Sequence, residues 1–224
     1  MILDIQFKNY RSFKDKCNFS MEASSTETKA NNVFVAPVSE NDEERLLKIA
    51  IIYGVNASGK TNIIRMLYAL RSMISNMTAN QGGEGIYLYE PFVLDEDSKN
   101  EPTEISISFI VNNIKHLYEL TYNGEEFLSE KLTYFPKGVA AILFERVPVE
   151  NDSIIKVYEP KYFTSIPKSK VQKFAVFSNK LILSKFLYDI PFDLITPAAK
   201  YLANIHIANG YHSRMINQLW DEMG

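Results

Sequence analysis

The sequence predicts an α/β fold in which a strand–loop–helix unit with a central sheet is joined to an antiparallel β-subdomain and to C-terminal helices. Three observations lead to this prediction. An apolar run at residues 46–53 enters a glycine-containing loop at residues 54–61, and apolar residues then recur at helical spacing. Residues 104–158 alternate as in a β meander. Because a long antiparallel sheet follows the helix in place of successive βα units, we expect a separate antiparallel subdomain.

The chain begins with two segments of strand character. Residues 2–7 alternate apolar and polar side chains, residues 16–22 alternate again, and residues 8–12 between them resemble a turn. We therefore expect an antiparallel hairpin. Residues 23–45 are polar and weakly periodic, which indicates a loop with a short edge strand at residues 32–35.

Residues 54–61 read Gly-Val-Asn-Ala-Ser-Gly-Lys-Thr, a complete G-x-x-x-x-G-K-[ST] phosphate-binding loop, or Walker A motif. Gly54 and Gly59 allow the backbone to curl so that successive N–H groups point at one anion. Lys60 supplies a positive charge for β- and γ-phosphates, and the Thr61 hydroxyl can ligate Mg²⁺. The apolar run before the loop predicts a buried strand. The helix after it would place its N-terminus under the phosphates, so the motif predicts a site for ATP and Mg²⁺.

The remaining elements follow from periodicity and turn signals. The helix after the loop should extend to Met77 and end at residues 80–85. Asn123-Gly124 lies between two strand-like runs and predicts a type I′ hairpin turn. Residues 168–176 are ambiguous. The chain from residue 186 has helical character, is broken by two prolines, and ends in an amphipathic stretch over 198–223.

Composition narrows the class of protein. The chain has 224 residues, is 46% apolar and 23% charged, and has a net charge of −3, which indicates a globular protein without the overall basic charge of a nucleic-acid-coating domain. Cys17 is the single cysteine, so the sequence has neither an intrachain disulfide nor a cysteine-based metal site, as expected of a cytoplasmic protein. No apolar stretch approaches membrane-spanning length, so we expect no membrane partner. The spacing of His206 and His212 places them on different helix faces, and we read all three histidines, His116 included, as structural or surface residues.

Two segments of the chain resemble a known family. Residues 1–15 contain Ile-Gln-Phe-Lys-Asn-Tyr-Arg-Ser-Phe, and residues 52–62 contain the loop followed by Asn62. Together they resemble the opening of SMC/RecF-like ATPases, and are most similar to the bacterial AAA-type ATPases of the RecF and OLD (overcoming-lysogenisation-defect) kind. The resemblance implies a P-loop head of ABC/SMC-like type that binds ATP between two heads, as a homodimer of the full protein. It also implies a task in DNA repair or phage defence, with DNA or an effector protein as partner.

The resemblance also assigns roles to residues by their position in the motifs. Asn56 and Lys60 would contact phosphates, Thr61 would hold Mg²⁺, and Arg11, in the turn after the first strand, matches a family position near the nucleotide. From the residues alone, an arginine in a hairpin turn is by default a surface residue, and it is the resemblance that keeps a role at the nucleotide equally open. The expected nucleotide-binding set is Arg11, Gly54, Asn56, Ala57, Ser58, Gly59, Lys60, Thr61 and Asn62.

The sequence departs from the family at the motifs needed for hydrolysis. The family has a Walker B strand, four apolar residues followed by Asp-Glu, and an L-S-G-G-like signature, and the sequence contains neither. Asp221-Glu222 follows a helical pattern, and the apolar run at 140–144 is followed by one carboxylate, Glu145. We therefore expect an N-terminal portion of a head, in which no catalytic residue is identified and which alone does not hydrolyse ATP. We expect its ranges to be 1–79 for the hairpin and loop unit, 86–160 for the antiparallel subdomain and 161–224 for a mainly helical segment.

Two other functions remain open. The first is a nucleotide-sensing or scaffold module that binds ATP without hydrolysis and holds a partner protein. The second is a kinase-like phosphotransferase, which would need a lid and an acceptor site; the β-rich segment after the helix speaks against it.

Overall fold

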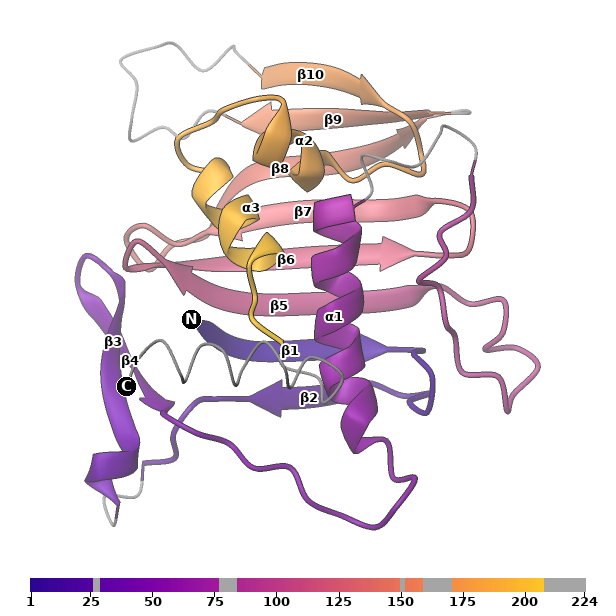
Figure 1. Ribbon diagram of the computed structural model, residues 1–224. Helices are drawn as coiled ribbons and strands as arrows, with labels where there is room; N and C mark the ends of the chain where they lie inside the picture. The colour runs from indigo at the N-terminus through magenta and orange to yellow at the C-terminus, as the bar shows by residue number, and fades with distance from the viewer. Residues whose placement is uncertain (26–28, 77–83, 150–151, 159–170, 208–224) are drawn as a thin grey trace, which may run out of the picture.

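One wide antiparallel sheet forms the frame of the structure (Figure 1). A computed structural model of the chain describes residues 1–25, 29–76, 84–149, 152–158 and 171–207. The eight strands of the sheet lie in the order β10-β9-β8-β7-β6-β5-β1-β2. Their bounds are β1 Ile2–Lys8, β2 Cys17–Ser20, β5 Thr103–Val111, β6 Ile114–Tyr122, β7 Phe127–Tyr134, β8 Ala141–Val149, β9 Asp152–Tyr158 and β10 Val171–Val176.

The expected N-terminal hairpin is confirmed. Strand β1 pairs with β2 in antiparallel register, with Ile5 opposite Phe19, and its other edge pairs with β5. The sheet therefore takes strands from outside the range 86–160, since β1 and β2 precede that range and β10 follows it. Strand β10 also lies within the range 161–224 that we expected to be mainly helical.

A tight turn that was not expected from the sequence joins β5 to β6. Asn112 and Asn113 are the two residues between these strands, and both have positive φ, 53° and 60°. Positive φ at both positions is the requirement of a type I′ turn, which asparagine tolerates.

The prediction of a type I′ turn at Asn123-Gly124 is wrong. Residues 123–126 separate β6 from β7, and Gly124 is not among the residues with positive φ. The Asn123 side chain closes this longer loop instead, because its Oδ1 accepts hydrogen bonds from the backbone N–H groups of Glu125 and Glu126, each at 2.8 Å.

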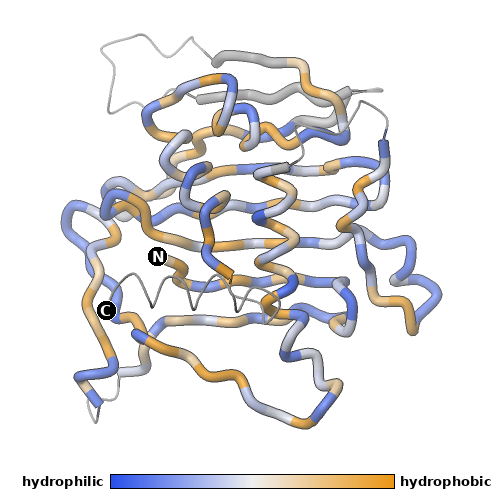
Figure 2. The backbone as a smooth tube through the Cα atoms, in the orientation of Figure 1, coloured by the Kyte–Doolittle hydropathy of each residue, from blue (hydrophilic) through white to orange (hydrophobic). Residues whose placement is uncertain are grey.

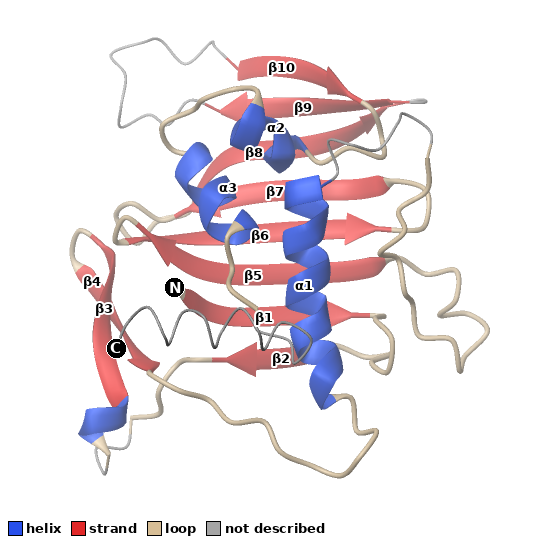
Figure 3. Ribbon diagram, in the orientation of Figure 1, coloured by secondary structure: helices blue, strands red, loops and turns tan. Residues whose placement is uncertain are grey.

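In the part of the chain that the structure describes, α-helices cover one face of the sheet (Figure 3). They are α1 Lys60–Asn76, α2 Ile182–Tyr188 and α3 Thr196–Ala203. The expected helix after the loop is thus confirmed as far as Asn76; Met77 and residues 80–83 lie outside the described residues. The helix expected over 198–223 ends at Ala203 in the described part of the chain, and residues 208–224 lie outside it.

The core lies between these helices and the sheet. Met66, Leu70 and Met73 of α1 are buried in one cluster with the inward-facing residues of β1, β5, β6 and β7. Burial of this many large side chains is the main source of stability of such a layer. The inward-facing residues of the strands are Ile5, Phe7, Ile105, Ile107, Phe109, Tyr118, Leu120, Tyr122, Phe127, Leu132 and Tyr134.

The prediction of a buried strand at residues 46–53 is wrong. Leu46 and Leu47 end β4 (Asp42–Leu47), and residues 48–53 are not in a strand. Ile49, Ile51 and Tyr53 are 74%, 81% and 91% exposed, and Figure 2 shows this hydrophobic run crossing from β4 to α1. A strand needs a neighbour for its hydrogen bonds. Among the described residues no strand pairs with this segment, so apolar character alone does not produce one.

The loop expected at 23–45 is more ordered than its polar composition indicates. It contains a short 3₁₀ turn, Ala30–Asn32, and strand β3 (Val33–Ser39), which pairs with β4 as a separate hairpin. The hairpin packs on the second face of the large sheet, where Val38 and Leu46 form a small buried cluster with Leu3 and Ile110. This contact explains why β3 is longer than the edge strand expected at 32–35.

No helix in the described part of the chain is long and apolar enough to span a membrane.

His116 lies in the core and gives a pH-dependent prediction. Its ring stacks on Phe109 at 5.4 Å between centroids, and Nδ1 donates to the carbonyl oxygen of Ile114 at 2.9 Å. Burial lowers the pKa of His116 from 6.5 to about 4. Between these two values the unfolded chain binds a proton that the folded chain does not, so stability falls as the pH drops through this window.

We expect the proton on His116 to remove about 2 kcal/mol of unfolding free energy between pH 7 and pH 5. The measurement is urea denaturation of the wild type and of His116→Phe at both pH values. The variant should lose that much less stability than the wild type over the same interval. Equal losses in the two proteins would contradict a neutral, buried His116.

Candidate functional site

The loop at residues 54–59 lies at the N-terminal end of α1, and its residues are exposed apart from a partly buried Gly59. Ala57 and Gly59 have positive φ, 63° and 89°, so the backbone curls as the motif requires. The first N–H groups of an α-helix have no partner within the helix, and the first turn of α1 carries no acidic residue. The dipole and the free amides of α1 therefore favour an anion in this loop.

Lys60 closes the loop on itself. Its Nζ donates to the carbonyl oxygens of Gly54 at 2.9 Å and Val55 at 2.5 Å, and lies 3.3 Å from Ser58 Oγ. The ammonium group is thus held on the concave side of the loop by neutral acceptors. A phosphate oxygen is a charged and stronger acceptor, so it can replace these contacts.

The turn between β1 and β2 braces the loop from the sheet side. Asn62 Nδ2 donates to Ser12 Oγ at 2.8 Å. A Cβ on Gly59 would lie 2.6 Å from Ser12 Oγ and 3.1 Å from the ring of Phe13, so a larger residue would clash at this position. The positive φ of Gly59 also favours glycine here. Phe13 in turn packs edge-to-face on Phe7 at 5.1 Å, which connects the loop to the core.

Arg11 lies in the same turn, next to Ser12, and its guanidinium is engaged with Glu90. Nε donates to Oε2 at 2.8 Å and Nη2 donates to Oε1 at 2.7 Å. Tyr10 Oη donates to the same carboxylate at 3.2 Å. The hydrogen bond from Arg11 is the main cause that lowers the pKa of Glu90, and the same bond raises the pKa of Arg11.

Asn9 fixes a second loop to this turn. It is buried, and its Nδ2 donates to the carbonyl oxygens of Ser98 at 2.9 Å and Glu101 at 2.7 Å. Its Oδ1 accepts from the backbone N–H of Phe92 at 2.9 Å. The Asn9–Phe13 turn therefore contacts both the N-terminal end of α1, next to the loop, and residues 90–102.

The remaining residues of the expected site lie close together because they are neighbours in the sequence. Asn56, Ala57 and Ser58 are exposed in the loop, and Thr61 is exposed on the first turn of α1, where its hydroxyl is accessible to a metal ion. Arg65, one turn further along α1, was not among the expected residues, and its Nη1 lies 3.5 Å from Asn62 Oδ1. The spacing of Arg65 from Thr61 places both on one helix face, which is the signal that could have found it.

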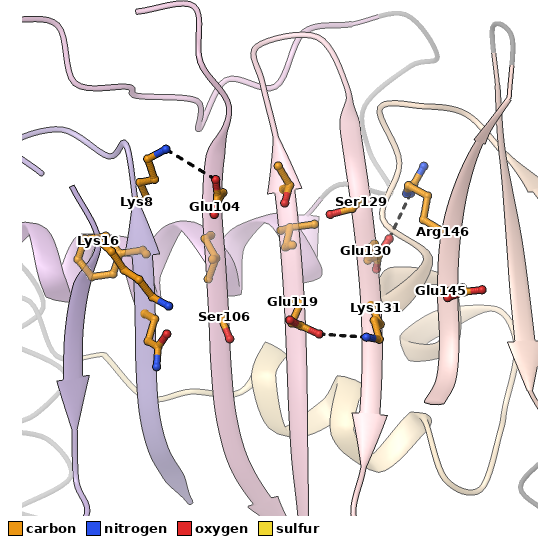
Figure 4. A pocket seen from close by; sticks show the side chains of 15 residues that line it. Lys8, Lys16, Glu104, Ser106, Glu119, Ser129, Glu130, Lys131, Glu145 and Arg146 are labelled. Carbon is orange, nitrogen blue, oxygen red and sulfur yellow. Dashed lines mark hydrogen bonds and ion pairs between the residues drawn. The ribbon is translucent and has the colours of Figure 1, made fainter. Parts of the chain in front are cut away.

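The carboxylates considered for hydrolysis do not join this site. Glu145 lies on β8, on the sheet face opposite α1, where it lines a hollow of about 450 Å³ (Figure 4). Asp221 and Glu222 lie outside the described residues. Within the described ranges no group of three or more His, Cys, Asp or Glu side chains could hold a metal ion, so Thr61 is the protein ligand that the motif offers to Mg²⁺.

The hollow itself has the character of a solvated sheet face. Its charged side chains alternate in sign, with Lys131 3.6 Å from Glu119 and Lys8 4.0 Å from Glu104 (Figure 4). Neither charge sign dominates, so this surface gives no sign of an anion or cation site.

Comparison with known proteins gives a match to a protein family. A family model described as "AAA domain, putative AbiEii toxin, Type IV TA system" matches residues 49–185, more than half of the chain. The matched range includes the whole Gly54–Thr61 loop, α1 and strands β5 to β10, whereas Arg11 lies before it. No curated protein matches the chain. The chain therefore belongs to this family of AAA domains, and so to the AAA-type class of P-loop ATPases.

Proposed function

We propose that this chain is the ATP-binding portion of an SMC/RecF/OLD-like ATPase head. The observation that carries the proposal is the Gly54–Thr61 loop at the N-terminus of α1, with Lys60 held at its centre. In the full protein, ATP would lie between two heads and drive their association as a homodimer. That association would act on DNA or on an effector protein, in DNA repair or phage defence. The family description as a putative toxin of a toxin–antitoxin system favours the effector side of this choice.

The residues present fit ATP and Mg²⁺. The loop offers backbone amides and Lys60 to the phosphates. Arg11, in the turn whose Ser12 contacts Asn62, and Arg65, which also contacts Asn62, add positive charge nearby. Mg²⁺ is held in such sites by a few protein oxygens, with phosphate and water oxygens completing the shell, so the Thr61 hydroxyl is a sufficient protein ligand. When bound, the metal would neutralise phosphate charge.

Hydrolysis by this chain alone is not part of the proposal. Phosphoryl transfer depends on a group that orients the attacking water, and the sequence contains no Walker B pair. The exposed apolar segment 49–53, together with Ile64 and Tyr68 on the outer side of α1, supports a half-head whose loop-bearing segment pairs with strands from elsewhere. The same surface is compatible with the alternative function, a non-hydrolysing sensor or scaffold that binds a partner protein.

Equilibrium binding of ATP to the full chain, with Mg²⁺ and with a chelator, tests the proposal. We expect saturable binding that Mg²⁺ strengthens, without phosphate release above background. Thr61→Val should lose most of the strengthening by Mg²⁺, because the valine methyl replaces the metal ligand at nearly equal volume. Thr121→Val, on the sheet face away from the loop, is the matched control and should behave as the wild type. Absence of saturable ATP binding by the wild type would contradict the proposal.

A further inference from the structure

We propose that Glu90 is a positioning residue, which orders the guanidinium of Arg11, in the turn that contacts the loop, so that Arg11 can bind a nucleotide phosphate. The inference rests on the proposed binding of ATP and adds to it a residue that belongs to no sequence motif.

The contacts between Glu90 and the turn fix both partners. The two carboxylate oxygens of Glu90 take the Nε and Nη2 donors of Arg11 at 2.8 and 2.7 Å, which is the bidentate arrangement of a strong ion pair. The backbone N–H of Arg11 donates to the carbonyl oxygen of Glu90 at 2.7 Å, and Tyr10 Oη donates to the carboxylate. Glu90 is therefore bound to the Tyr10–Arg11 turn through its main chain and its side chain together.

This arrangement leaves one edge of the guanidinium available. Glu90 occupies the edge formed by Nε and Nη2, and within the part of the chain that the structure describes no hydrogen bond is made by Nη1. A guanidinium has five N–H donors, so it can bind a carboxylate along one edge and a phosphate oxygen along another. The pair is also accessible, with Arg11 29% and Glu90 39% exposed.

The position of the pair connects it to the loop. The residue after Arg11 is Ser12, whose Oγ contacts Asn62 in the first turn of α1 and restricts Gly59. Arg65 of α1 also contributes to lowering the pKa of Glu90, so positive charge from both the turn and the helix surrounds this carboxylate. Glu90 thus remains charged at neutral pH and stays paired with Arg11.

The direction of the effect distinguishes positioning from competition. A free arginine side chain loses rotamer freedom when it binds a ligand, and a partner that already orders it removes that cost. Loss of Glu90 should then weaken ATP binding. If Glu90 instead competed with phosphate for Arg11, or acted only through its negative charge, its loss would strengthen ATP binding.

The test is the dissociation constant of Mg-ATP for the full chain, measured for Glu90→Gln, Arg11→Gln and the double variant. We expect Glu90→Gln to weaken binding about fivefold and Arg11→Gln about tenfold. In the Arg11→Gln background, Glu90→Gln should have no further effect, because Glu90 acts through Arg11. Glu104→Gln removes one negative charge at β5 without contacting Arg11, and it should not weaken binding. Arg11→Lys, which keeps the charge and loses the bidentate contact, should behave as Glu90→Gln.

Each other outcome overturns the inference. Unchanged or tighter ATP binding by Glu90→Gln, with the wild type binding ATP, refutes the positioning role and leaves the proposed function intact. A further loss in the Arg11→Gln background shows that Glu90 acts on the fold and not through Arg11. Failure of the wild type to bind ATP removes both proposals. Thermal melts without nucleotide, equal within the series, show that the comparison is between folded proteins.

Discussion

Replacement of Lys60 by alanine is expected to weaken Mg-ATP binding about 100-fold, because a charge-assisted contact to two phosphates contributes about 3 kcal/mol. The structure gives a second reason for a large effect. In the structure, the carbonyl oxygens of Gly54 and Val55 both accept hydrogen bonds from the Lys60 ammonium. Without it these oxygens face an incoming phosphate directly, and their partial negative charges oppose binding.

Two measurements separate this effect from a change in the fold or in overall charge. Urea denaturation without nucleotide should give nearly equal unfolding free energies for Lys60→Ala and the wild type, because the contacts of Lys60 are exposed. Lys48→Ala is the matched control. Its Nζ donates to the carbonyl oxygen of Asn31 at 2.7 Å, so this variant loses the same charge and a similar hydrogen bond away from the loop. Wild-type affinity in Lys60→Ala would show that nucleotide does not occupy this loop.

The residues of the loop could be predicted from the sequence because they are contiguous. Its backbone conformation depends on local properties, such as the positive φ of Gly59 and the start of α1 at Lys60. Helix α1 and the β1–β2 hairpin were predictable for the same reason, since each carries its own periodicity. The type I′ turn was predicted at the wrong pair, because Asn123-Gly124 has the stronger local signal whereas strand register places the tight turn at Asn112-Asn113.

Features that depend on distant partners could not be predicted in this way. Residues 48–53 have the composition of a buried strand, yet a strand also requires a neighbouring strand, which the described residues do not supply. Arg11 was expected near the nucleotide from its motif, but its partner Glu90 is 79 residues away in sequence and lies in no motif. The hydrogen bonds of the Asn9 side chain likewise depend on carbonyl groups about 90 residues later in the chain.

Replacement of Glu130 by alanine is expected to destabilise the protein by about 4 kcal/mol, a large fraction of the stability of a domain. Glu130 lies on β7 with a side chain that is 0% exposed. It accepts hydrogen bonds from Tyr118 Oη at 3.0 Å and from the backbone N–H groups of Ile182 and Leu183 at 2.8 and 2.9 Å. This one carboxylate therefore joins β6 and β7 to the first turn of α2.

The loss of stability on removal of Glu130 arises mainly from the buried Arg146, which would lose its counter-ion. Arg146 on β8 is also fully buried and pairs with Glu130 at 3.2 Å, while its Nη2 donates to the carbonyl oxygen of Lys180 as well. The Nε and Nη1 atoms of Arg146 have no hydrogen-bond partner among the described residues, and its guanidinium lies 5.9 Å from the ring centroid of Phe127. Removal of Glu130 leaves a buried charge without a counter-ion, which is far more costly than the loss of one hydrogen bond.

Urea denaturation of three variants tests this account. Glu130→Ala should show the full loss, whereas Glu130→Leu combined with Arg146→Met should recover much of it, since the pair is replaced by apolar side chains and no charge remains buried. The recovery should be incomplete, because the amides of Ile182 and Leu183 still lack an acceptor. Glu119→Gln is the control on the neighbouring strand. Glu119 forms an ion pair with Lys131, and the two side chains are 42% and 40% exposed, respectively. This pair should contribute less than about 1 kcal/mol to the unfolding free energy. If Glu130→Ala lost no more unfolding free energy than this control, Arg146 would have to find another counter-ion or reach solvent. The Glu130 carboxylate would then not be what holds α2 to the sheet.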